Sequence, residues 1–332
     1  MKPLAVAFSD LHIHNWKAHN KNGNRSRAHT NALLEIGGVA KDLRVPCLFS
    51  GDISHAFGKI DLELWDIFME VFYLWGQNNY PMIYGITGNH DQESANYDSD
   101  KQSRSTWELL TRIFPKILYN LDFAHTDTDN FRVMGIPYLT YNKSFDQWVR
   151  HFRTRLATTN ANILLIHTDL HGAVDVAGRE YNTTEEIPEN MAEYFKDFDL
   201  VLSGHIHTPQ KLGKNIIMVG SPLEQKRNDS GTDYGYWIIE GDPGKKPRAK
   251  FVPLFDYPKF IQLKPGEEPK DDHNYYLPAE EVIEKAEVDT GFSNTVSKEK
   301  LVKRYLKHIG ETSVAKKKAL IHILNEAEGD WQ

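Results

Sequence analysis

Residues 4–12 read Leu-Ala-Val-Ala-Phe-Ser-Asp-Leu-His, a short apolar run that leads into two side chains able to bind a metal ion. The same arrangement returns four times: residues 47–52 end in Gly-Asp, residues 82–91 in Gly-Asn-His-Asp, residues 163–167 in a histidine and residues 200–207 in Gly-His-Ile-His. Short apolar runs bounded by turn residues are typical of buried strands. Because sites in open α/β sheets form just outside the carboxyl ends of the strands, these runs predict one convergent metal site.

The donor types in these runs narrow the choice of metal. Carboxylate, imidazole and carbonyl oxygen donors without a thiolate suit Mn, Fe, Co or Zn. The donors are too many for one closed tetrahedral site, but they fit two ions that share a bridging carboxylate. Two ions about 3.5–4 Å apart can activate water and clamp a phosphoryl group, so we infer in-line displacement at phosphorus. The candidate ligands are Asp10, His12, Asp52, Asn89, His167, His205 and His207.

The composition is that of a globular protein. The chain has 332 residues, of which 40% are hydrophobic, enough for one large domain or for a large and a small one. The single cysteine, Cys47, excludes an internal disulfide and fits a reducing compartment. No run approaches the ~18 apolar residues of a membrane span. These features predict a cytoplasmic protein with no membrane association.

The charge is unevenly distributed along the chain. A net charge of −7 argues against a nucleic-acid partner. However, residues 11–34 contain no acidic residue and follow the first ligand motif directly, where a phosphate backbone would approach the metals. On composition alone, a solvated basic loop and a set of phosphate contacts fit equally well. The candidate substrate-binding residues of this loop are Lys17, Lys21, Arg25 and Arg27.

Helical patterns lie between the strand and motif units. Alternating strands and helices predict a layered α/β fold. One helix, at residues 61–75, is apolar nearly all round, so it is expected to be buried inside the domain or in a homodimer interface. We predict a homodimer through this helix and the helix near residues 105–114. The other expected elements are a helix at 28–43, a strand at 131–136, a helix at 145–156 and a closing hairpin over 236–254.

The C-terminal part of the chain has a different composition. Residues 264–272 are rich in Pro, Gly and charge and read as a linker. Helices are expected beyond it at residues 279–288, 297–309 and 313–327. The last two have thin apolar stripes, and short helices of this kind are marginal on their own. They need either the main domain or another protein to pack against, and of the two we expect docking on another protein, through Leu301, Tyr305, Leu306, Leu320 and Leu324.

The ordered set Asp-x-His, Gly-Asp, Gly-Asn-His-Asp, His and Gly-His-x-His resembles the calcineurin-like metallophosphoesterase superfamily over residues 1–255. Residues 51–55, Gly-Asp-Ile-Ser-His, and residues 220–222, Gly-Ser-Pro, are similar to its SbcD branch of bacterial and phage DNA double-strand-break repair nucleases. The resemblance implies an α/β sandwich with two central sheets flanked by helices and a small C-terminal helical extension. It also implies a Mn²⁺-dependent nuclease that acts on DNA as part of a larger complex.

The resemblance further implies roles for the candidate residues. One ion would be held by Asp10, His12 and His207, and the other by Asn89, His167 and His205, with Asp52 bridging them. His90 would protonate the leaving oxygen or stabilise its charge. Asp91 would orient His90, and His55 would help to position the DNA phosphate or strand end.

The resemblance also implies a division of the chain and a partner. Residues 1–255 would form the nuclease domain, 256–295 a reduced cap or linker, and 296–332 a segment that docks on an SbcC-like coiled-coil ATPase. The family usually has a sizeable cap, for which this chain has little room. Two other classes remain open: a small-substrate phosphatase or phosphodiesterase, and a non-catalytic scaffold. Intact candidate ligands argue against a scaffold, and the absence of arginine from residues 51–58 argues against a protein phosphatase.

Overall fold

The computed structural model spans the 332 residues of the chain. The described residues are 1–15, 24–55, 57, 59–93, 105–139, 143–158, 160–181, 188–226, 229–242, 245–255, 257–264, 266–270 and 274–277. All of them lie within one compact unit, Met1–Ala279. The helices expected between residues 279 and 327 lie outside the described residues, as do Lys17 and Lys21.

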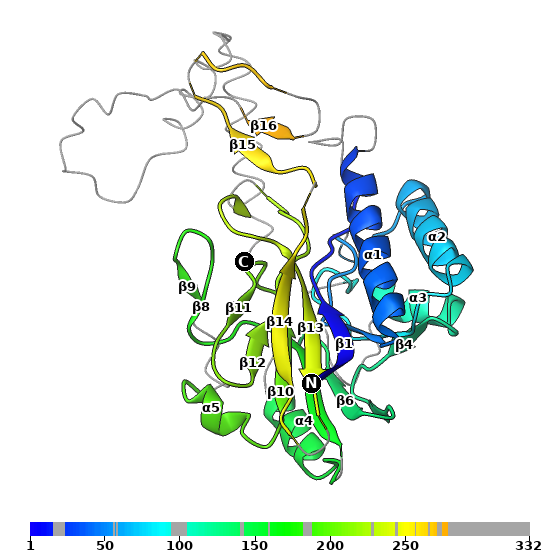
Figure 1. Ribbon diagram of the computed structural model, residues 1–332, viewed down its shortest axis with the longest axis vertical. Coiled ribbons are helices and arrows are strands. Elements are labelled where there is room, and N and C mark those ends of the chain that lie inside the picture. Colours follow the sequence, from blue (N-terminus) through cyan, green and yellow to red (C-terminus); the bar gives the residue numbers. More distant parts are fainter. Residues whose placement is uncertain are drawn as a thin grey trace, which may run out of the picture. The chain divides into compact units, whose positions relative to one another are not determined.

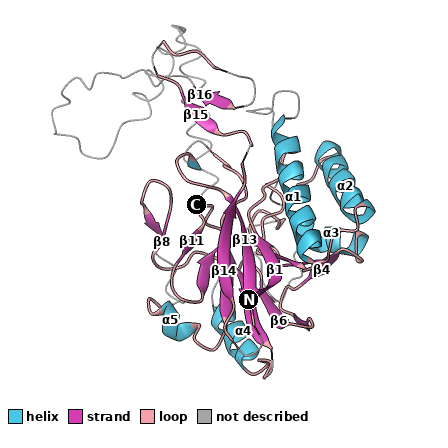
Figure 2. Ribbon diagram, viewed as in Figure 1, coloured by secondary structure: helices cyan, strands magenta, loops and turns pink. Residues whose placement is uncertain are grey.

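Two six-stranded mixed sheets form the centre of this unit (Figures 1 and 2). The first sheet has the order β14-β13-β1-β2-β3-β4, in which β1 to β4 are parallel and β13 and β14 form an antiparallel hairpin. The parallel strands place their carboxyl ends at one edge. The bounds are β1 Lys2–Phe8, β2 Cys47–Phe49, β3 Ile83–Gly85, β4 Leu118–Asn120, β13 Gly235–Gly241 and β14 Arg248–Pro253.

The second sheet has the order β11-β12-β10-β7-β6-β5. Its four central strands are parallel, and the two edge strands, β11 and β5, are antiparallel to their neighbours. The strand expected at 131–136 is confirmed as β6. The bounds are β5 His125–Asp127, β6 Phe131–Ile136, β7 Ala161–His167, β10 Leu200–Gly204, β11 Gln210–Lys211 and β12 Ile216–Met218.

Five helices complete the described part of this unit, and the expected helices recur with small shifts at their ends. Helices α1 (Asn24–Leu43), α2 (Leu62–Gln77) and α3 (Thr106–Ile113) lie together on one side of the first sheet in Figure 1. Helices α4 (Lys143–Arg153) and α5 (Met191–Tyr194) pack on the second sheet. Asp61 caps α2 by accepting a hydrogen bond from the Leu64 amide at 2.9 Å, and Ser105 caps α3 in the same way.

The packing of the core explains why the strands of both sheets have continuous apolar sequences. Along β1, Val6 and Phe8 belong to the cluster beneath α1 to α3, whereas Ala5 and Ala7 belong to the cluster between the two sheets. Side chains on a strand alternate between faces, so a strand buried on both faces must be apolar throughout. A third cluster lies between the second sheet and helices α4 and α5. The layered α/β fold with two central sheets is therefore confirmed.

Helix α2 is less uniformly buried than its sequence suggests. One face, which includes Leu64, Phe68 and Trp75, packs in the core beneath the helices. Two apolar side chains remain outside that core, because Leu62 is 86% exposed and Tyr73 is 62% exposed. The domain itself thus accounts for most of the apolar surface of this helix.

The region expected as a linker contains some regular structure. Strands β15 (Phe260–Gln262) and β16 (Tyr275–Leu277) pair in parallel there. Elsewhere in the chain, β8 (Ala173–Val174) and β9 (Glu180–Tyr181) form a small antiparallel pair. The division of the chain at residue 255 remains a prediction.

Within the described residues, no helix combines the length and apolar character needed to cross a membrane.

Candidate metal centre

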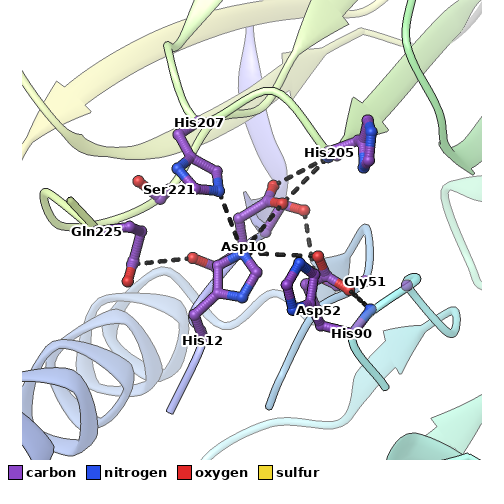
Figure 3. A network of polar contacts seen from close by, with 12 residues as sticks. Asp10, His12, Gly51, Asp52, His90, His205, His207, Ser221 and Gln225 are labelled. Atoms are coloured by element: carbon purple, nitrogen blue, oxygen red, sulfur yellow. Dashed lines mark hydrogen bonds and ion pairs between the residues drawn. The ribbon is translucent and has the colours of Figure 1, made fainter. Parts of the chain in front are cut away.

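The seven predicted metal ligands all follow the carboxyl ends of strands. Asp10 and His12 follow β1, Asp52 follows β2 and Asn89 follows β3 in the first sheet. In the second sheet, His167 is the last residue of β7, while His205 and His207 follow β10. Figure 3 shows Asp10, His12, Asp52 and His207 grouped together, with the His205 backbone N–H joined to the Asp10 carboxylate. The structure thus brings ligands from both sheets to one place.

The backbone at these positions is strained. Four of the candidate ligands have a left-handed backbone, with φ of 50° at Asp10, 47° at His12, 62° at Asp52 and 87° at His205. This conformation is uncommon for residues other than glycine and is retained mostly where function requires it. It turns the chain sharply within four residues of the strand end, so the side chains point into the shared space.

The first group of donors contains Asp10, His12 and His207. The His12 Nε2 atom lies 3.2 Å from the His207 Nε2 atom and 3.8 Å from the Asp10 Oδ1 atom. The three residues each offer a ligand atom within 4.8 Å of the others. Asp10 also holds the two sheets together, since its carboxylate accepts the His205 backbone N–H.

The second group contains Asn89, His167 and His205. The Asn89 Oδ1 atom lies 3.0 Å from the His167 Nε2 atom and 2.9 Å from the His205 Nδ1 atom. Asp52 lies between the groups, because its Oδ2 atom is 3.5 Å from His12 Nε2 and 3.3 Å from His167 Nε2. One carboxylate oxygen therefore faces an imidazole of each group, as a bridging ligand would.

The protonation chemistry of these residues fits divalent cations. Burial lowers the pKa of His12, and burial together with the neighbouring His167 lowers that of His205 to about 3, so both rings are neutral and offer a lone pair. Burial opposes charge on His167 too, but the carboxylates of Asp52 and Asp10 raise its pKa to about 9. The facing Nε2 atoms of His12 and His207 can share only one proton, whereas a cation would satisfy both. The side chains of Asp10 and Asp52 are 0% and 2% exposed, so a cation would also compensate their buried charge.

Two hydrogen bonds orient imidazoles of the centre, and a further carboxylate lies near a third ring. The Ser50 carbonyl lies 2.6 Å from His167 Nδ1, so that nitrogen carries a proton, and Nε2 faces the centre, where a cation would replace the second proton that the raised pKa implies. Asp229 Oδ2 lies 3.1 Å from His207 Nδ1, whereas Asp169 Oδ1 approaches His205 Nε2 to 3.4 Å without a hydrogen bond. Neither aspartate was expected from the sequence. Asp169 follows His167 at a spacing of two, which could have indicated it, but Asp229 has no such signal.

Arg25 stabilises the backbone around the candidate metal centre, and its side chain does not face the candidate ligands. Its side chain is only 3% exposed. Its Nη2 donates to the Gln225 carbonyl at 2.6 Å, its Nε donates to His14 Nε2 at 2.8 Å, and its guanidinium lies over the rings of Phe260 and Tyr275. The predicted phosphate contact is therefore not supported, because burial directs this side chain into the protein. Arg27, by contrast, is exposed on α1.

Gln225 connects Arg25 to the first ligand loop. Its Nε2 donates to the Asp10 carbonyl at 3.1 Å (Figure 3). The same atom donates to the Leu11 carbonyl at 3.3 Å. This contact spans more than 200 residues of sequence and has no local signal. Arg25 and Gln225 thus hold the loop that carries Asp10 and His12.

Three aromatic rings lie beside the first group of donors. The His90 ring centroid is 4.7 Å from that of His12, 4.5 Å from His55 and 4.1 Å from Phe57. The His90 backbone N–H donates to Asp52 Oδ1 at 2.8 Å, which ties its position to the shared carboxylate. His55 Nδ1 lies 3.1 Å from His12 Nδ1. The structure therefore brings His55 and His90 together with the candidate ligands.

Asp91 acts on the loops around His90. Its carboxylate accepts hydrogen bonds from the backbone N–H groups of Asp52, Ser54 and Gly88, at 2.9, 3.0 and 3.0 Å. Burial, followed by the charge of Asp52, raises the pKa of Asp91 to about 7. Among the described residues, His90 Nδ1 has no hydrogen-bond partner. Asp91 would thus influence His90 through the backbone of the β2 and β3 loops, instead of through its ring.

Comparisons with known proteins find a matching family model, similar sequences and similar structures. The model of the calcineurin-like phosphoesterases matches residues 5–209. The SbcD component of the SbcCD nuclease of Staphylococcus saprophyticus is 26% identical over 188 residues, which are 52% of this chain and 49% of that protein. Its counterpart in Staphylococcus epidermidis is 23% identical over 183 residues, with the same coverage. A solved dimetal phosphatase from Danio rerio aligns with 72% of this chain and 93% of its own at 11% identity and a TM-score of 0.45. The chain spans about half the length of the curated relatives it matches.

Proposed function

The chain belongs to the calcineurin-like phosphoesterase family, whose members are hydrolases of phosphoester bonds, and from this we propose that it is a dimetal nuclease acting on DNA. The observation that carries the proposal is the position of Asp52, with one carboxylate oxygen facing both His12 and His167. A shared carboxylate between two donor groups suits a pair of ions that act together on one phosphodiester.

The ligand roles follow from the two groups. Asp10, His12 and His207 would hold one ion, Asn89, His167 and His205 would hold the other, and Asp52 would be common to both. Oxygen and imidazole donors without thiolates suit Mn²⁺. The ions, when bound, would supply a water nucleophile at neutral pH and withdraw charge from the phosphoryl oxygens.

His90 and His55 would act on the substrate from the side of the first group. His90 would donate a proton to the leaving oxygen or stabilise its charge, because its ring borders His12 and its backbone is held by Asp52. His55 lies against both His12 and His90, where it would help to position the phosphate or the strand end. Asp91 would keep the loops of Asp52 and His90 at a fixed separation.

The choice of DNA as substrate rests on the curated relatives, both of which are named as components of an SbcCD nuclease. We extend this to an SbcC-like coiled-coil ATPase as the partner, bound through residues 296–332. We also propose a homodimer. Exposed apolar side chains on α2 and α3 support it, namely Leu62, Tyr73, Leu109 and Ile113.

The test is cleavage by the purified protein of linear duplex DNA, single-stranded DNA and bis-p-nitrophenyl phosphate, each with Mn²⁺ or with EDTA. We expect Mn²⁺-dependent cleavage of DNA. The His90→Ala variant serves as the control for contaminating nucleases, since it should lose activity on DNA and on the small ester together. Cleavage of the small ester without any cleavage of DNA, even with the partner ATPase present, would overturn the nuclease assignment. It would favour a small-substrate phosphodiesterase on the same fold.

A further inference from the structure

We propose that Phe57 forms a stacking subsite for an unpaired nucleobase of the substrate, next to the bond that is cleaved. The inference rests on the proposed nuclease function, because it names the part of a nucleic acid that the same site would recognise. It goes beyond that function in assigning a substrate contact to a side chain that is neither a metal ligand nor a proton donor.

The position of Phe57 places it at the edge of the centre. Its ring centroid lies 4.1 Å from that of His90, with an angle of 35° between the planes, and 6.3 Å from that of His55. His90 in turn lies 4.7 Å from His12. A series of rings therefore leads from a candidate metal ligand, through the proposed proton donor, to Phe57.

The exposure of Phe57 is the second observation. Although phenylalanine is normally buried, this side chain is 44% exposed. Scattered exposed apolar residues are ordinary and need no explanation by themselves. This one differs because one part of its ring is in contact with His90 while much of the remainder meets solvent directly beside the site. A ring supported on one side and open elsewhere can accept a second flat group.

The backbone at Phe57 is the third observation. Its φ is 46°, in the left-handed region, which is unfavourable for a bulky aromatic residue. Four of the candidate metal ligands share this unusual conformation. Such strain persists where the surrounding structure enforces it, and it is concentrated at functional sites. Strain that holds an apolar ring in water next to His90 indicates that the exposed ring has a use.

A nucleobase is the flat group that the proposed function supplies. Each base of a strand follows its neighbour by about 3.4 Å, so a base adjoining the scissile phosphate would lie within reach of a ring that contacts His90. Every base has a π-face, so stacking would tolerate any sequence. The base must be unpaired or flipped out of the duplex to stack on protein. The subsite therefore favours single-stranded or frayed DNA over an intact duplex.

The experiment combines a protein change with a substrate change. Short single-stranded oligonucleotides carry one abasic tetrahydrofuran residue, placed at each position in turn, and Mn²⁺-dependent cleavage is resolved at each linkage. For the wild type we expect kcat/KM at one linkage next to the abasic residue to fall roughly 5- to 150-fold, as stacking of about 1–3 kcal/mol per base implies. Phe57→Leu should lose a similar factor on intact DNA and show little further loss at that abasic position. Phe57→Trp should restore both the rate and the abasic sensitivity.

Tyr119→Leu is the matched control, because Tyr119 is an aromatic of similar exposure, 40%, on β4. It should cleave intact DNA like the wild type and keep the abasic sensitivity. Equal wild-type rates at every abasic position overturn the subsite, whether or not the variants fold. The subsite is also overturned if Phe57→Leu lowers only kcat and does so by the same factor on intact DNA and on every abasic substrate. That result would mean that Phe57 only supports the His90 ring. A wild type that cleaves bis-p-nitrophenyl phosphate but no DNA overturns the proposed function itself.

Discussion

Gly88→Ala should disable the centre through a single added methyl group. A Cβ at this position would lie 2.7 Å from the Asp52 Cγ atom and closer still to Oδ1 of the same carboxylate. Ordinary van der Waals contact begins at 3.4 Å. The two backbones cannot simply move apart, because the N–H groups of Gly88 and Asp52 both donate to the Asp91 carboxylate. The added Cβ would also lie closer than 2.7 Å to the Asp52 backbone nitrogen, so the methyl group must displace both this backbone and the carboxylate that lies between the two donor groups.

The displacement required is roughly 1 Å, and a misplacement of that size can lower a rate by about 10²-fold. The expected result is at least this loss in kcat/KM on bis-p-nitrophenyl phosphate, together with weaker binding of both ions. Overpacking of this kind destabilises a core by about 1–3 kcal/mol. At roughly 2–4 °C per kcal/mol for a domain of about this size, the melting temperature should fall by no more than about 12 °C, which leaves the protein folded.

The assay measures Mn²⁺ binding by titration calorimetry, hydrolysis of the small ester, and thermal unfolding by circular dichroism. Gly76→Ala is the matched control, since a Cβ there meets nothing within 4 Å and lies near the end of α2. It should keep full activity and be stabilised by up to about 1 kcal/mol, because alanine favours a helix over glycine. A Gly88→Ala protein that binds two ions with wild-type affinity and retains its activity would refute the reasoning.

Three other predictions concern the proton donor, the dimer and the C-terminal segment. His90→Ala should keep both ions and lose roughly 10²–10⁴-fold in rate, whereas Asp52→Ala should lose both ions; metal analysis of the two proteins decides, and a metal-free His90→Ala would contradict the assigned role. Light scattering should find a wild-type dimer that Tyr73→Glu with Leu109→Glu dissociates, because both side chains are exposed; a wild-type monomer at micromolar concentration would exclude the interface. Deletion of residues 297–332 should spare activity on the small ester and abolish ATP-stimulated degradation by the complex with an SbcC-like ATPase, and unfolding of the catalytic domain on deletion would disprove independent docking.

The positions of the candidate ligands could be predicted because each one lies at the end of its strand or within four residues of it. Asp10 comes two residues after β1, and His167 is the last residue of β7. Strands that are buried on both faces must be apolar, so each strand end is visible as the point where polar residues begin. Parallel strands then bring those ends to one edge of a sheet. Local sequence and one rule of topology are therefore sufficient to collect the ligands within each sheet.

The partition of the strands between two sheets is a tertiary property. The β1 and β10 ends meet only because the two sheets pack face to face, with Ala5 and Leu202 in the same cluster. The sequence shows that both strands are apolar, but it does not show which faces lie opposite each other. Packing also decided that Asp52 lies between His12 and His167.

The supporting contacts were invisible in the sequence for the same reason. Arg25 reads as one more basic residue in a basic loop, and only the structure shows it buried against Gln225 and the rings of Phe260 and Tyr275. Those partners lie 200 or more residues further along the chain, so no local pattern connects them. Asp229, which orients His207, is another such case.

The sequence by itself determined the strand ends and the donor types, because these depend on residues that are neighbours along the chain. The tertiary structure alone decided which donors share a group, which side chains orient them, and that Phe57 stands exposed beside His90. Those features depend on packing between distant segments and on a strained backbone, which a pattern of residue types does not encode.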